Sequence, residues 1–346
     1  MKRAEFSESQ AALPLDTVAL GQYLEGRLAG FEGDFVVRKF AGGQSNPTYK
    51  VEAAGRAWVL RKKPTGTLLP TAHMVDREYR VLSGLADTDV PVARPLLYCS
   101  DAAVIGTEFF IMEYVQGRIF WDPTLPELAA SERRELYDEM VRVLGALHRI
   151  DYRSRGLGDY GRPGNYFARQ IKRWSEQYAS SSTDRVVAMD ELMVWLPAHV
   201  PDDDTTTLVH GDFRLDNMIF HPREPRVLAV LDWELSTLGH PLADLAYNCM
   251  PYHLASPDRP ALSLLAGAAS GIPTEAEYVA AYAQQVGRSG VADFSFYLAF
   301  SLFRYASIVQ GVYRRGLLGN ASSGAEAISY RQRVLDAAEV AWALVG

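Results

Sequence analysis

The patterning of apolar residues changes near residue 116, and this change constrains the fold of the 346-residue chain more than any other feature. Before it, short apolar runs alternate with polar residues, as in half-buried strands. After it, long stretches follow the period of amphipathic helices. A chain of this length suits two domains or one large two-lobed domain. We therefore predict an α+β protein, with a small β-rich lobe at residues 1–115 and a larger, mostly helical lobe at residues 116–346.

The N-terminal lobe is predicted to combine an antiparallel sheet with two helices. Asp16 is a suitable N-cap for a helix over residues 16–29, whose apolar stripe includes Val18, Leu20 and Leu24. Strands are expected at residues 34–40, 48–53 and 57–62, followed by a helix at 73–85 and two further strands within 93–115.

The C-terminal lobe is predicted to be helical apart from a short β patch. Ser131 is the expected N-cap of a long amphipathic helix. The apolar stretch from Tyr297 to Tyr313 is interrupted by Arg304 and Gln310, so it predicts a buried helix rather than a membrane span. Other helices are expected at residues 165–180 and 185–196, and short strands at 207–210, 218–220 and 227–233.

Charge and cysteine content argue against several classes of protein. With 35 basic and 42 acidic residues, the net charge is −7, which suits nucleic-acid phosphates poorly. Cys99 and Cys249 form neither a zinc-binding pattern nor a disulfide framework, which favours a reducing compartment. The first residues lack the apolar core of a secretory signal. We expect a cytoplasmic protein with no nucleic-acid or membrane partner.

The segment HGDFRLDN at residues 210–217, followed by LDWE at residues 231–234, carries the strongest chemical signal. Asp212 and Asn217 are five residues apart, and Asp232 lies 15 residues beyond Asn217. Taken alone, an Asp five residues before an Asn is a common pattern, because both residues also cap turns. Carboxylate and amide oxygens are hard ligands of the kind that Mg²⁺ prefers. Asn217 and Asp232 are therefore candidate Mg²⁺ ligands.

The order of these residues resembles the catalytic loop and metal-binding segment of the kinase-like fold. The His-Gly-Asp and Asp-Trp-Glu motifs are similar to those of the aminoglycoside phosphotransferase and choline kinase family. The resemblance implies an ATP-dependent kinase with catalytic residues His210, Asp212 and Asn217, in which Asp212 accepts the proton of a substrate hydroxyl. It also implies that Asn217 and Asp232 bind Mg²⁺. Glu234 is either a further metal ligand or a polar residue that closes the turn.

Two other acidic residues near this motif have structural interpretations. Asp244 resembles the family's structural aspartate that braces the catalytic loop, whereas Asp216 is expected to be a solvated turn residue. No Ala-Pro-Glu motif follows Asp232, and Asp244 comes only 12 residues later, which leaves no room for a peptide-docking activation loop. The acceptor is therefore expected to be a small molecule.

Upstream residues match the nucleotide-phosphate site of the same fold. Gly42, Gly43 and Ser45 lie in a Gly-rich turn between two predicted strands, where backbone N–H groups can approach phosphates. Arg61 stands where kinases carry a phosphate-binding Lys, and Glu78 matches the helix glutamate that pairs with this cation. The plain alternatives are a hairpin turn, a solvated basic strand end and a surface glutamate.

The end of the last predicted strand of this lobe resembles the hinge of the kinase-like fold. Glu113 and Val115 would hold adenine through backbone groups, so that these residues, with those above, form an ATP site. The alternative is a core strand that ends at a Gly turn.

The acceptor class is indicated by charge and by a closer resemblance. From Pro251 to Gly346, seven acidic and seven basic residues balance, whereas a polycationic acceptor favours an acidic lining. Residues 59–66, 72–78, 114–118 and 303–315 resemble the phosphotransferase-like domains fused to, or encoded beside, acyl-CoA dehydrogenases. This resemblance implies phosphorylation of a hydroxyacyl-CoA, such as a 4-hydroxyacyl-CoA, and a functional link to an acyl-CoA dehydrogenase.

Such an anionic CoA thioester would suit Arg304, Arg314 or Arg315, although each can equally belong to a helix face that pairs with acids or solvent. Two other functions stay open. One is an aminoglycoside- or choline-type kinase. The other is a nucleotide-binding pseudokinase, which would be expected to lack a catalytic or metal-binding residue.

Overall fold

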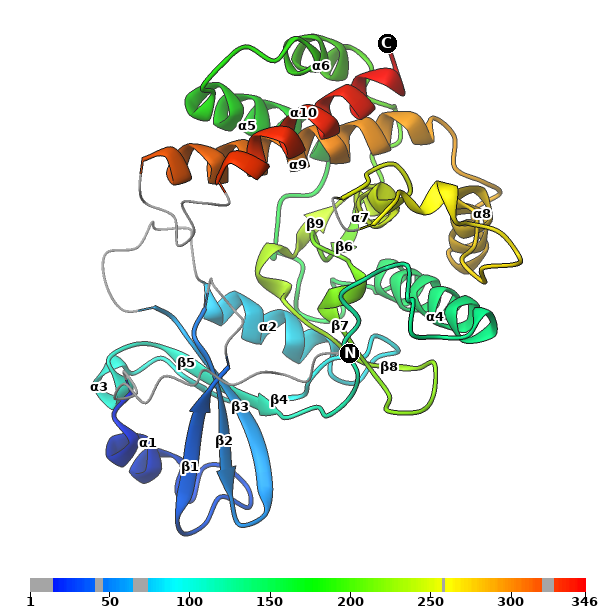
Figure 1. Ribbon diagram of the computed structural model, residues 1–346. Coiled ribbons are helices and arrows are strands. Elements are labelled where there is room, and N and C mark those ends of the chain that lie inside the picture. The colour runs from blue at the N-terminus through cyan, green and yellow to red at the C-terminus, as the bar shows by residue number, and fades with distance from the viewer. Residues whose placement is uncertain (1–14, 41–45, 65–73, 257–258, 319–326) are drawn as a thin grey trace. The chain divides into compact units, whose positions relative to one another are not determined.

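The computed structural model describes residues 15–40, 46–64, 74–256, 259–318 and 327–346 (Figure 1). The chain divides into two compact units. Unit 1 comprises the chain up to Trp121 together with Tyr152–Tyr160 and Leu215–Ser236, and unit 2 comprises Asp122–Asp151, Gly161–Arg214 and Thr237–Gly346. The segment at residues 210–217 is thus divided after Arg214, and each part is held by its own unit.

Unit 1 is built on a five-stranded sheet in the order β1-β2-β3-β5-β4, in which all neighbours are antiparallel. The predicted antiparallel sheet is confirmed. The elements of the unit are α1 (Thr17–Leu24), β1 (Phe35–Lys39), β2 (Thr48–Ala53), β3 (Arg56–Lys62), α2 (Val75–Leu85), β4 (Pro95–Cys99), α3 (Ala102–Ile105), β5 (Phe109–Glu113), η1 (Leu215–Asn217), β7 (Met218–Phe220), β8 (Val227–Val230) and η2 (Trp233–Leu235).

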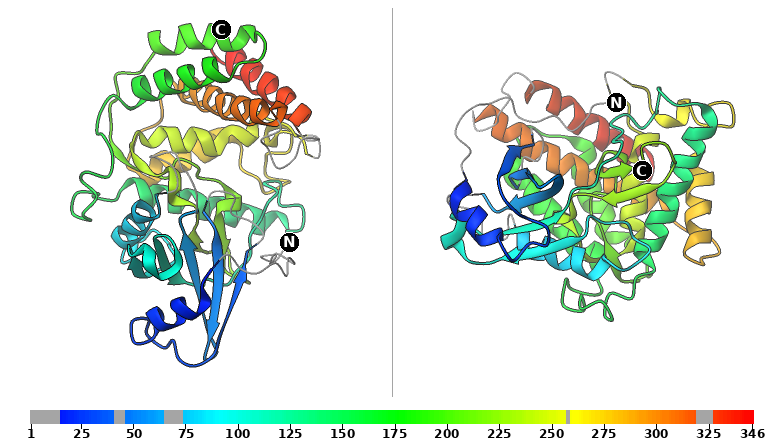
Figure 2. Two further views of the ribbon diagram at one scale, coloured as in Figure 1. Left: turned by 90° about the vertical axis from the view of Figure 1, so that its left-hand side faces the viewer. Right: turned by 90° about the horizontal axis from the view of Figure 1, so that it is seen from below.

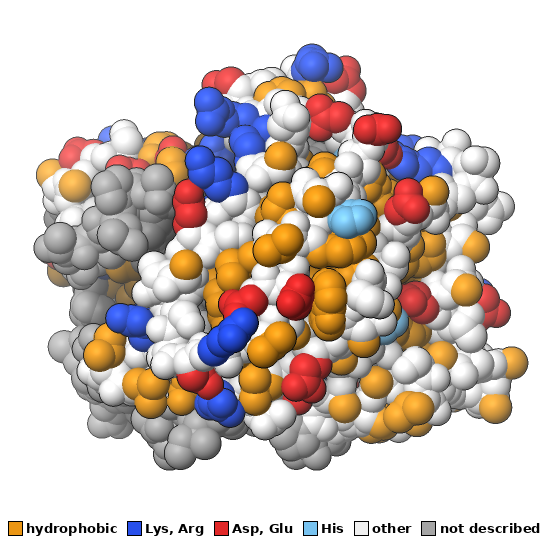
Figure 3. Space-filling model, turned by 90° about the horizontal axis from the view of Figure 1, so that it is seen from above, with side chains coloured by type: hydrophobic (Ala, Val, Ile, Leu, Met, Phe, Trp, Pro, Cys, Tyr) orange, Lys and Arg blue, Asp and Glu red, His pale blue; other side chains and the backbone are white. Residues whose placement is uncertain are grey.

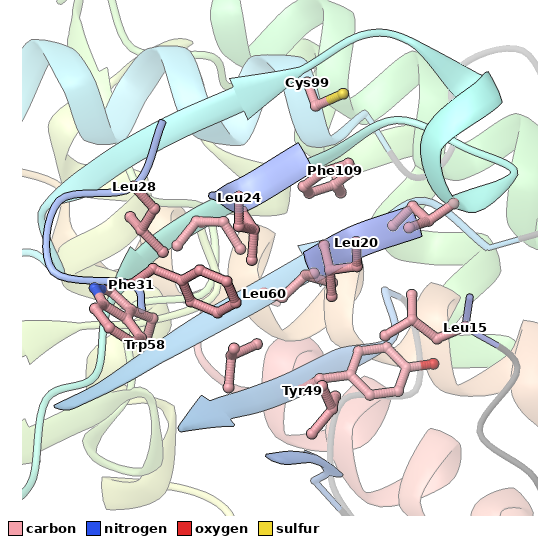
Figure 4. Close-up of a cluster of buried hydrophobic side chains, with 14 of the residues drawn as sticks. Leu15, Leu20, Leu24, Leu28, Phe31, Tyr49, Trp58, Leu60, Cys99 and Phe109 are labelled. Carbon is pink, nitrogen blue, oxygen red and sulfur yellow. The ribbon is translucent and has the colours of Figure 1, made fainter. Parts of the chain in front are cut away.

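The two faces of the sheet carry different side chains because successive residues of β3 alternate between them. Trp58 and Leu60 are buried on the face covered by α1, within the hydrophobic cluster of Figure 4. Arg61 points to the opposite face, where its Nε lies 2.8 Å from Glu78 Oε2 on α2. Trp58 and Leu60 therefore belong to the apolar cluster, whereas Arg61 forms an ion pair with α2.

Helix α1 begins as predicted, but its buried face is narrower. Asp16 Oδ1 accepts a hydrogen bond from the Ala19 N–H at 2.9 Å, which confirms the N-cap. Leu20 and Leu24 are buried. The placement of Val18 on the buried stripe is wrong, because this side chain is 70% exposed.

A β hairpin of β7 and β8 continues unit 1 and contacts the chain that follows β5. Arg118 and Phe220 exchange two backbone hydrogen bonds of 2.8 Å each. Gly117 lies so close to this hairpin that a Cβ at its position would collide with the Phe220 carbonyl oxygen. Glycine is required there by this close approach.

Unit 2 is mostly helical, with one short antiparallel pair of strands, β6 and β9. Helices α9 and α10 lie along each other, with α5 and α6 beside them (Figures 1 and 2). The elements of the unit are α4 (Ala130–His148), α5 (Tyr166–Ser181), α6 (Val187–Ala198), β6 (Thr207–Val209), β9 (Thr237–Gly239), α7 (Pro241–Cys249), η3 (Met250–Tyr252), η4 (Leu262–Leu264), α8 (Glu275–Gln285), α9 (Phe294–Leu317) and α10 (Ala327–Ala343).

The start of α4 differs from the prediction. Ala129 is the N-cap, and Ser131 lies inside the first turn, so the expected N-cap at Ser131 is wrong by two residues. The Ala129 N–H donates to Glu132 Oε2 at 3.2 Å, and this side chain satisfies the first free backbone donor.

The long apolar helix of the C-terminal part is buried as predicted. It lies within α9, where Phe300, Leu302 and Phe303 are inaccessible to solvent. Across the described ranges, no helix combines the length and the apolar character needed to cross a bilayer. On the face drawn in Figure 3, Lys and Arg side chains are interspersed with Asp, Glu and hydrophobic side chains.

Candidate active site

The loop that follows β6 in unit 2 is braced by the buried carboxylate of Asp244, on α7. Asp244 accepts hydrogen bonds from the N–H groups of His210, at 2.6 Å, and Gly211, at 2.8 Å. Burial alone would raise the pKa of this carboxyl, but hydrogen bonds from His148 and from the His210 N–H hold the pKa below its usual value. Asp244 therefore stays ionised, and its expected bracing of the loop is confirmed.

His210 contacts the backbone of the same loop. Its side chain is fully buried, and its Nδ1 lies 3.1 Å from the Asp212 N, from which it accepts a hydrogen bond. The ring proton is accordingly on Nε2. His210, which was predicted to be a catalytic residue, therefore contacts the backbone of the loop and is not exposed to solvent.

The Asp212 side chain is 16% exposed, so its carboxylate is more accessible than the fully buried His210 ring. Its Oδ1 lies 3.1 Å from the Nε of Arg214. The Tyr247 hydroxyl hydrogen-bonds with the same carboxylate, and burial together with the Asp212 charge raises the pKa of Tyr247 above its usual value. The tyrosine therefore remains protonated and donates to Asp212.

Two further contacts to this loop were not foreseen from the sequence. Asn248 Nδ2 donates to the Phe213 carbonyl at 3.0 Å, and Arg304 Nη2 donates to the Gly211 carbonyl at 2.8 Å. Asp244, Tyr247 and Asn248 share one face of α7, because residues three and four apart on a helix are neighbours. That spacing was the signal from which the sequence could have predicted the contact of Asn248 with the loop. No local pattern connects Arg304 to Gly211, which lies 93 residues away.

Unit 1 holds the candidate metal ligands on the β7–β8 hairpin. Asn217 directly precedes β7, and its carbonyl accepts a hydrogen bond from the Leu231 N–H at 2.8 Å. Because Met218 pairs with Val230, the hairpin register sets Asn217 opposite the residue that precedes Asp232. Asp232 itself has a φ of +64°, an uncommon conformation that often marks functional sites.

Arg61 joins three carboxylates of unit 1. Its Nε lies 2.8 Å from Glu78 Oε2, and its Nη2 lies 3.0 Å from Asp232 Oδ1 and 3.6 Å from Glu234 Oε2. One guanidinium among three carboxylates leaves two negative charges in excess when all are ionised. Burial, followed by the charges of Asp232 and Glu234, raises the pKa of Glu78 to about 7 in spite of Arg61.

This cluster suits a hard divalent cation. Mg²⁺ usually binds one or two protein carboxylates, and phosphate oxygens and water complete its shell. Asp232 and Glu234 are two carboxylates of this cluster, and its excess negative charge favours a cation. The predicted ligand Asn217 lies on the same hairpin as Asp232 and carries an amide oxygen. Within the part of the chain that the structure describes, no group of three or more His, Cys, Asp and Glu side chains is arranged to hold a metal ion.

The remaining predicted nucleotide residues are described only in part. Gly42, Gly43 and Ser45 lie outside the described residues. The Glu113 N–H donates to the Arg94 carbonyl at 2.9 Å, so this N–H is already engaged within unit 1. Val115 lies two residues beyond the end of β5.

The arginines suggested for an anionic acceptor differ in burial. Arg304 is buried, whereas Arg314 and Arg315 are exposed. Arg314 donates to the Ser182 carbonyl at 3.2 Å. Only Arg304 is thus tied to the loop that carries Asp212.

Comparison with known families identifies the chain. The model of the phosphotransferase enzyme family matches residues 36–280. The chain belongs to the phosphotransferase enzyme family. It is accordingly a phosphotransferase, and the matched region contains the braced loop, the ionic cluster and the β7–β8 hairpin.

Two relatives match this chain over one part of their own, longer sequences. Mouse acyl-CoA dehydrogenase family member 10 is 46% identical over 338 residues, which cover 96% of this chain and 31% of that protein. Chicken acyl-CoA dehydrogenase family member 11 is 47% identical over 330 residues, which cover 92% of this chain and 42% of that protein. The chain thus spans well under half the length of these relatives.

Solved structures show the same fold. A Ralstonia eutropha protein, provisionally named an aminoglycoside phosphotransferase, is 50% identical with a TM-score of 0.88, and the match covers 95% of this chain and 98% of that one. Aminoglycoside phosphotransferase APH(4)-Ia, solved with AMP-PNP and hygromycin B, is 16% identical with a TM-score of 0.60, and the match covers 93% and 98%. These similarities confirm the predicted α+β kinase-like fold class.

Proposed function

We propose that this phosphotransferase moves the γ-phosphoryl group of ATP, with Mg²⁺, to the hydroxyl of a small molecule, and that the acceptor is a hydroxyacyl-CoA such as a 4-hydroxyacyl-CoA. The observation that carries the proposal is the Asp212 carboxylate, partly exposed on a loop whose backbone is held by Asp244, Asn248 and Arg304. A positioned carboxylate of this kind is suited to receive a proton from an attacking hydroxyl.

Nucleotide binding is assigned to residues of the 1–115 lobe and to the hairpin. Arg61, oriented by Glu78, binds ATP phosphates, and the Glu113 carbonyl and the Val115 N–H meet the adenine edge. Asn217 and Asp232 hold Mg²⁺, with Glu234 as a further ligand. Bound Mg²⁺ supplies neutralisation of the negative charge on the phosphates.

The chemical step is assigned to the 116–346 lobe. The acceptor oxygen forms a bond to the γ-phosphorus of ATP while the bond from that phosphorus to the bridging oxygen breaks. Asp212 takes the proton of the acceptor hydroxyl and later releases it to water. The products are the phosphorylated acceptor, ADP and one proton, and His210 and Tyr247 keep Asp212 in place during the transfer.

The acceptor class is supported by the groups around Asp212. The guanidinium of Arg214 approaches the carboxylate, and that of Arg304 binds the neighbouring Gly211 carbonyl. Cationic groups beside the base suit an anionic acceptor better than a polycationic antibiotic. The names of the mouse and chicken relatives refer to acyl-CoA dehydrogenases, which agrees with a CoA thioester and with a functional link to such a dehydrogenase.

A coupled assay of ADP release, with ATP and Mg²⁺, tests the proposal. The acceptors compared are 3- and 4-hydroxyacyl-CoAs, choline, ethanolamine and kanamycin. Asp212→Asn removes the proposed base, and Asp216→Asn is the matched control, because it removes the same charge from the half-buried turn residue of the loop. We expect turnover with a hydroxyacyl-CoA that is lost in Asp212→Asn and kept in Asp216→Asn.

An aminoglycoside kinase is the second candidate, because the Ralstonia eutropha protein at 50% identity bears that provisional name. Turnover with kanamycin and none with the CoA thioesters would favour it. Nucleotide binding without transfer to any acceptor would instead indicate a pseudokinase.

A further inference from the structure

Arg304 is a buried cation that takes part in no step of the proposed phosphoryl transfer. Its side chain is 6% exposed, and its guanidinium lies between two rings, 5.6 Å from the centroid of Trp174 and 5.3 Å from that of Tyr247. Among the described residues, its Nε has no hydrogen-bond partner, and no carboxylate lies within ion-pair distance of its guanidinium. Burying a guanidinium without a carboxylate is costly, and two ring faces offset only part of that cost.

Among the described residues, this guanidinium has one hydrogen-bond partner, the peptide group that joins Gly211 to Asp212. The carbonyl of that peptide accepts from Arg304 Nη2 at 2.8 Å, and its N–H donates to His210 Nδ1 at 3.1 Å. Both ends of a single peptide group are therefore held by side chains. A rotation of this peptide group would break both hydrogen bonds and change the direction in which the Asp212 side chain points.

The Gly211–Asp212 peptide group needs such restraint because it follows a glycine. Gly211 has a φ of +85°, which glycine adopts without strain, and glycine equally permits other orientations of the following peptide. The backbone conformation at Gly211 is thus not selected by the residue itself. It is selected by the groups that bind the peptide.

Arg304 also reaches the side chain of Asp212 through Tyr247. The guanidinium lies over the Tyr247 ring, and the hydroxyl of this ring hydrogen-bonds with the Asp212 carboxylate. Trp174 on α5 closes the other side of the guanidinium. Side chains from α5, α7 and α9 therefore meet at Arg304, which acts on Asp212 through the Gly211 carbonyl and through the Tyr247 ring.

We propose that Arg304 is a positioning residue that holds the Gly211–Asp212 peptide and the Tyr247 ring in the arrangement that presents the Asp212 carboxylate to the acceptor. Its role in turnover rests on the proposed function, whereas its restraint of the loop does not. The restraint is tested by measuring the exchange of the loop in the absence of substrate. The role in turnover is tested separately by measuring the reaction with substrate.

The test compares Arg304→Met with Arg333→Met, a control on the neighbouring helix α10 that removes the same charge from an exposed side chain. Amide hydrogen exchange of the nucleotide-free protein, followed by mass spectrometry, reports on residues 208–216. We expect Arg304→Met to accelerate exchange there by roughly tenfold or more while the rest of unit 2 keeps wild-type rates, since a lost local restraint opens the loop and not the whole unit. Arg333→Met should match the wild type.

Kinetics supply the second readout. Arg304→Met should lower kcat by about 10²-fold, because small displacements of a catalytic group cost about this much, and should leave KM for ATP within about twofold of the wild type. Arg304→Lys keeps a cation and a donor for the Gly211 carbonyl, so it should recover part of the loss. If Arg304→Met does not fold, the same measurements on Arg304→Lys provide the test.

The outcomes distinguish this inference from the proposed function. If the wild type phosphorylates no acceptor of the panel, faster local exchange in Arg304→Met still supports the restraint. If the wild type is active but Arg304→Met keeps wild-type exchange and kcat, the inference is overturned and the function stands. Faster exchange throughout unit 2 would also overturn it, because it would indicate a general packing role.

Discussion

Replacing Glu78 with glutamine should stabilise the nucleotide-free protein at high pH and leave it unchanged at low pH. Glu78 is buried with Arg61 in a cluster that also contains Asp232 and Glu234. Burial first, and then the two neighbouring carboxylates, raise its pKa from 4.5 to about 7. Glutamine keeps the shape of the protonated acid but cannot ionise, so Glu78→Gln removes the repulsion without opening a cavity.

The size and the pH window of the effect follow from the raised pKa. A carboxyl whose pKa is higher in the folded protein binds its proton more tightly there, so ionisation destabilises the fold as pH rises. The loss begins near pH 4.5 and is complete just above pH 7. One pKa unit corresponds to about 1.4 kcal/mol, so the ionised carboxylate costs the folded state about 3 kcal/mol.

Urea unfolding, followed by tryptophan fluorescence in EDTA, measures the free energy of unfolding of both proteins across this range. The gap between Glu78→Gln and the wild type should grow from near zero at about pH 4.5 to about 3 kcal/mol at about pH 8. Asp76→Asn, an exposed change on the same helix, is the control and should show no such growth. A gap that does not change with pH would refute the reasoning, as would a less stable variant at pH 8.

Three further outcomes are expected. Asp244→Asn places an amide group against the N–H groups of His210 and Gly211, so urea unfolding should show a loss of about 3 kcal/mol. Because the pKa of Asp244 is below its usual 3.8, the wild type should keep this contribution above about pH 4 and lose it only as pH falls further. Gly117→Ala should destabilise by about 2 kcal/mol through its collision with the Phe220 carbonyl, and an unchanged unfolding midpoint would contradict that geometry. Asp232→Asn should reduce the initial rate of ADP release by about 10²-fold or more, with partial recovery at high Mg²⁺; full activity would remove Asp232 from the metal site.

The local pattern of the sequence was sufficient for the sheet and for the face on which Arg61 lies. Strand residues alternate between faces, so the burial of Trp58 and Leu60 sends Arg61 to the other side. The same pattern was insufficient for the start of α4. Several residues near Ser131 can begin a helix, and the choice of Ala129 depends on the reach of the Glu132 side chain.

The sequence by itself determined the order of the chemical groups: a strand arginine, a helix glutamate, a loop aspartate and a hairpin aspartate. It did so because a loop or hairpin motif is local, and its spacing survives in any structure that the chain adopts. Only the tertiary structure decided which distant groups hold Asp212. An arginine within the apolar stretch of α9 predicts burial, but its bond to Gly211, 93 residues earlier, depends on how α5, α7 and α9 pack. Helix packing brings these residues together through contacts that no local pattern encodes.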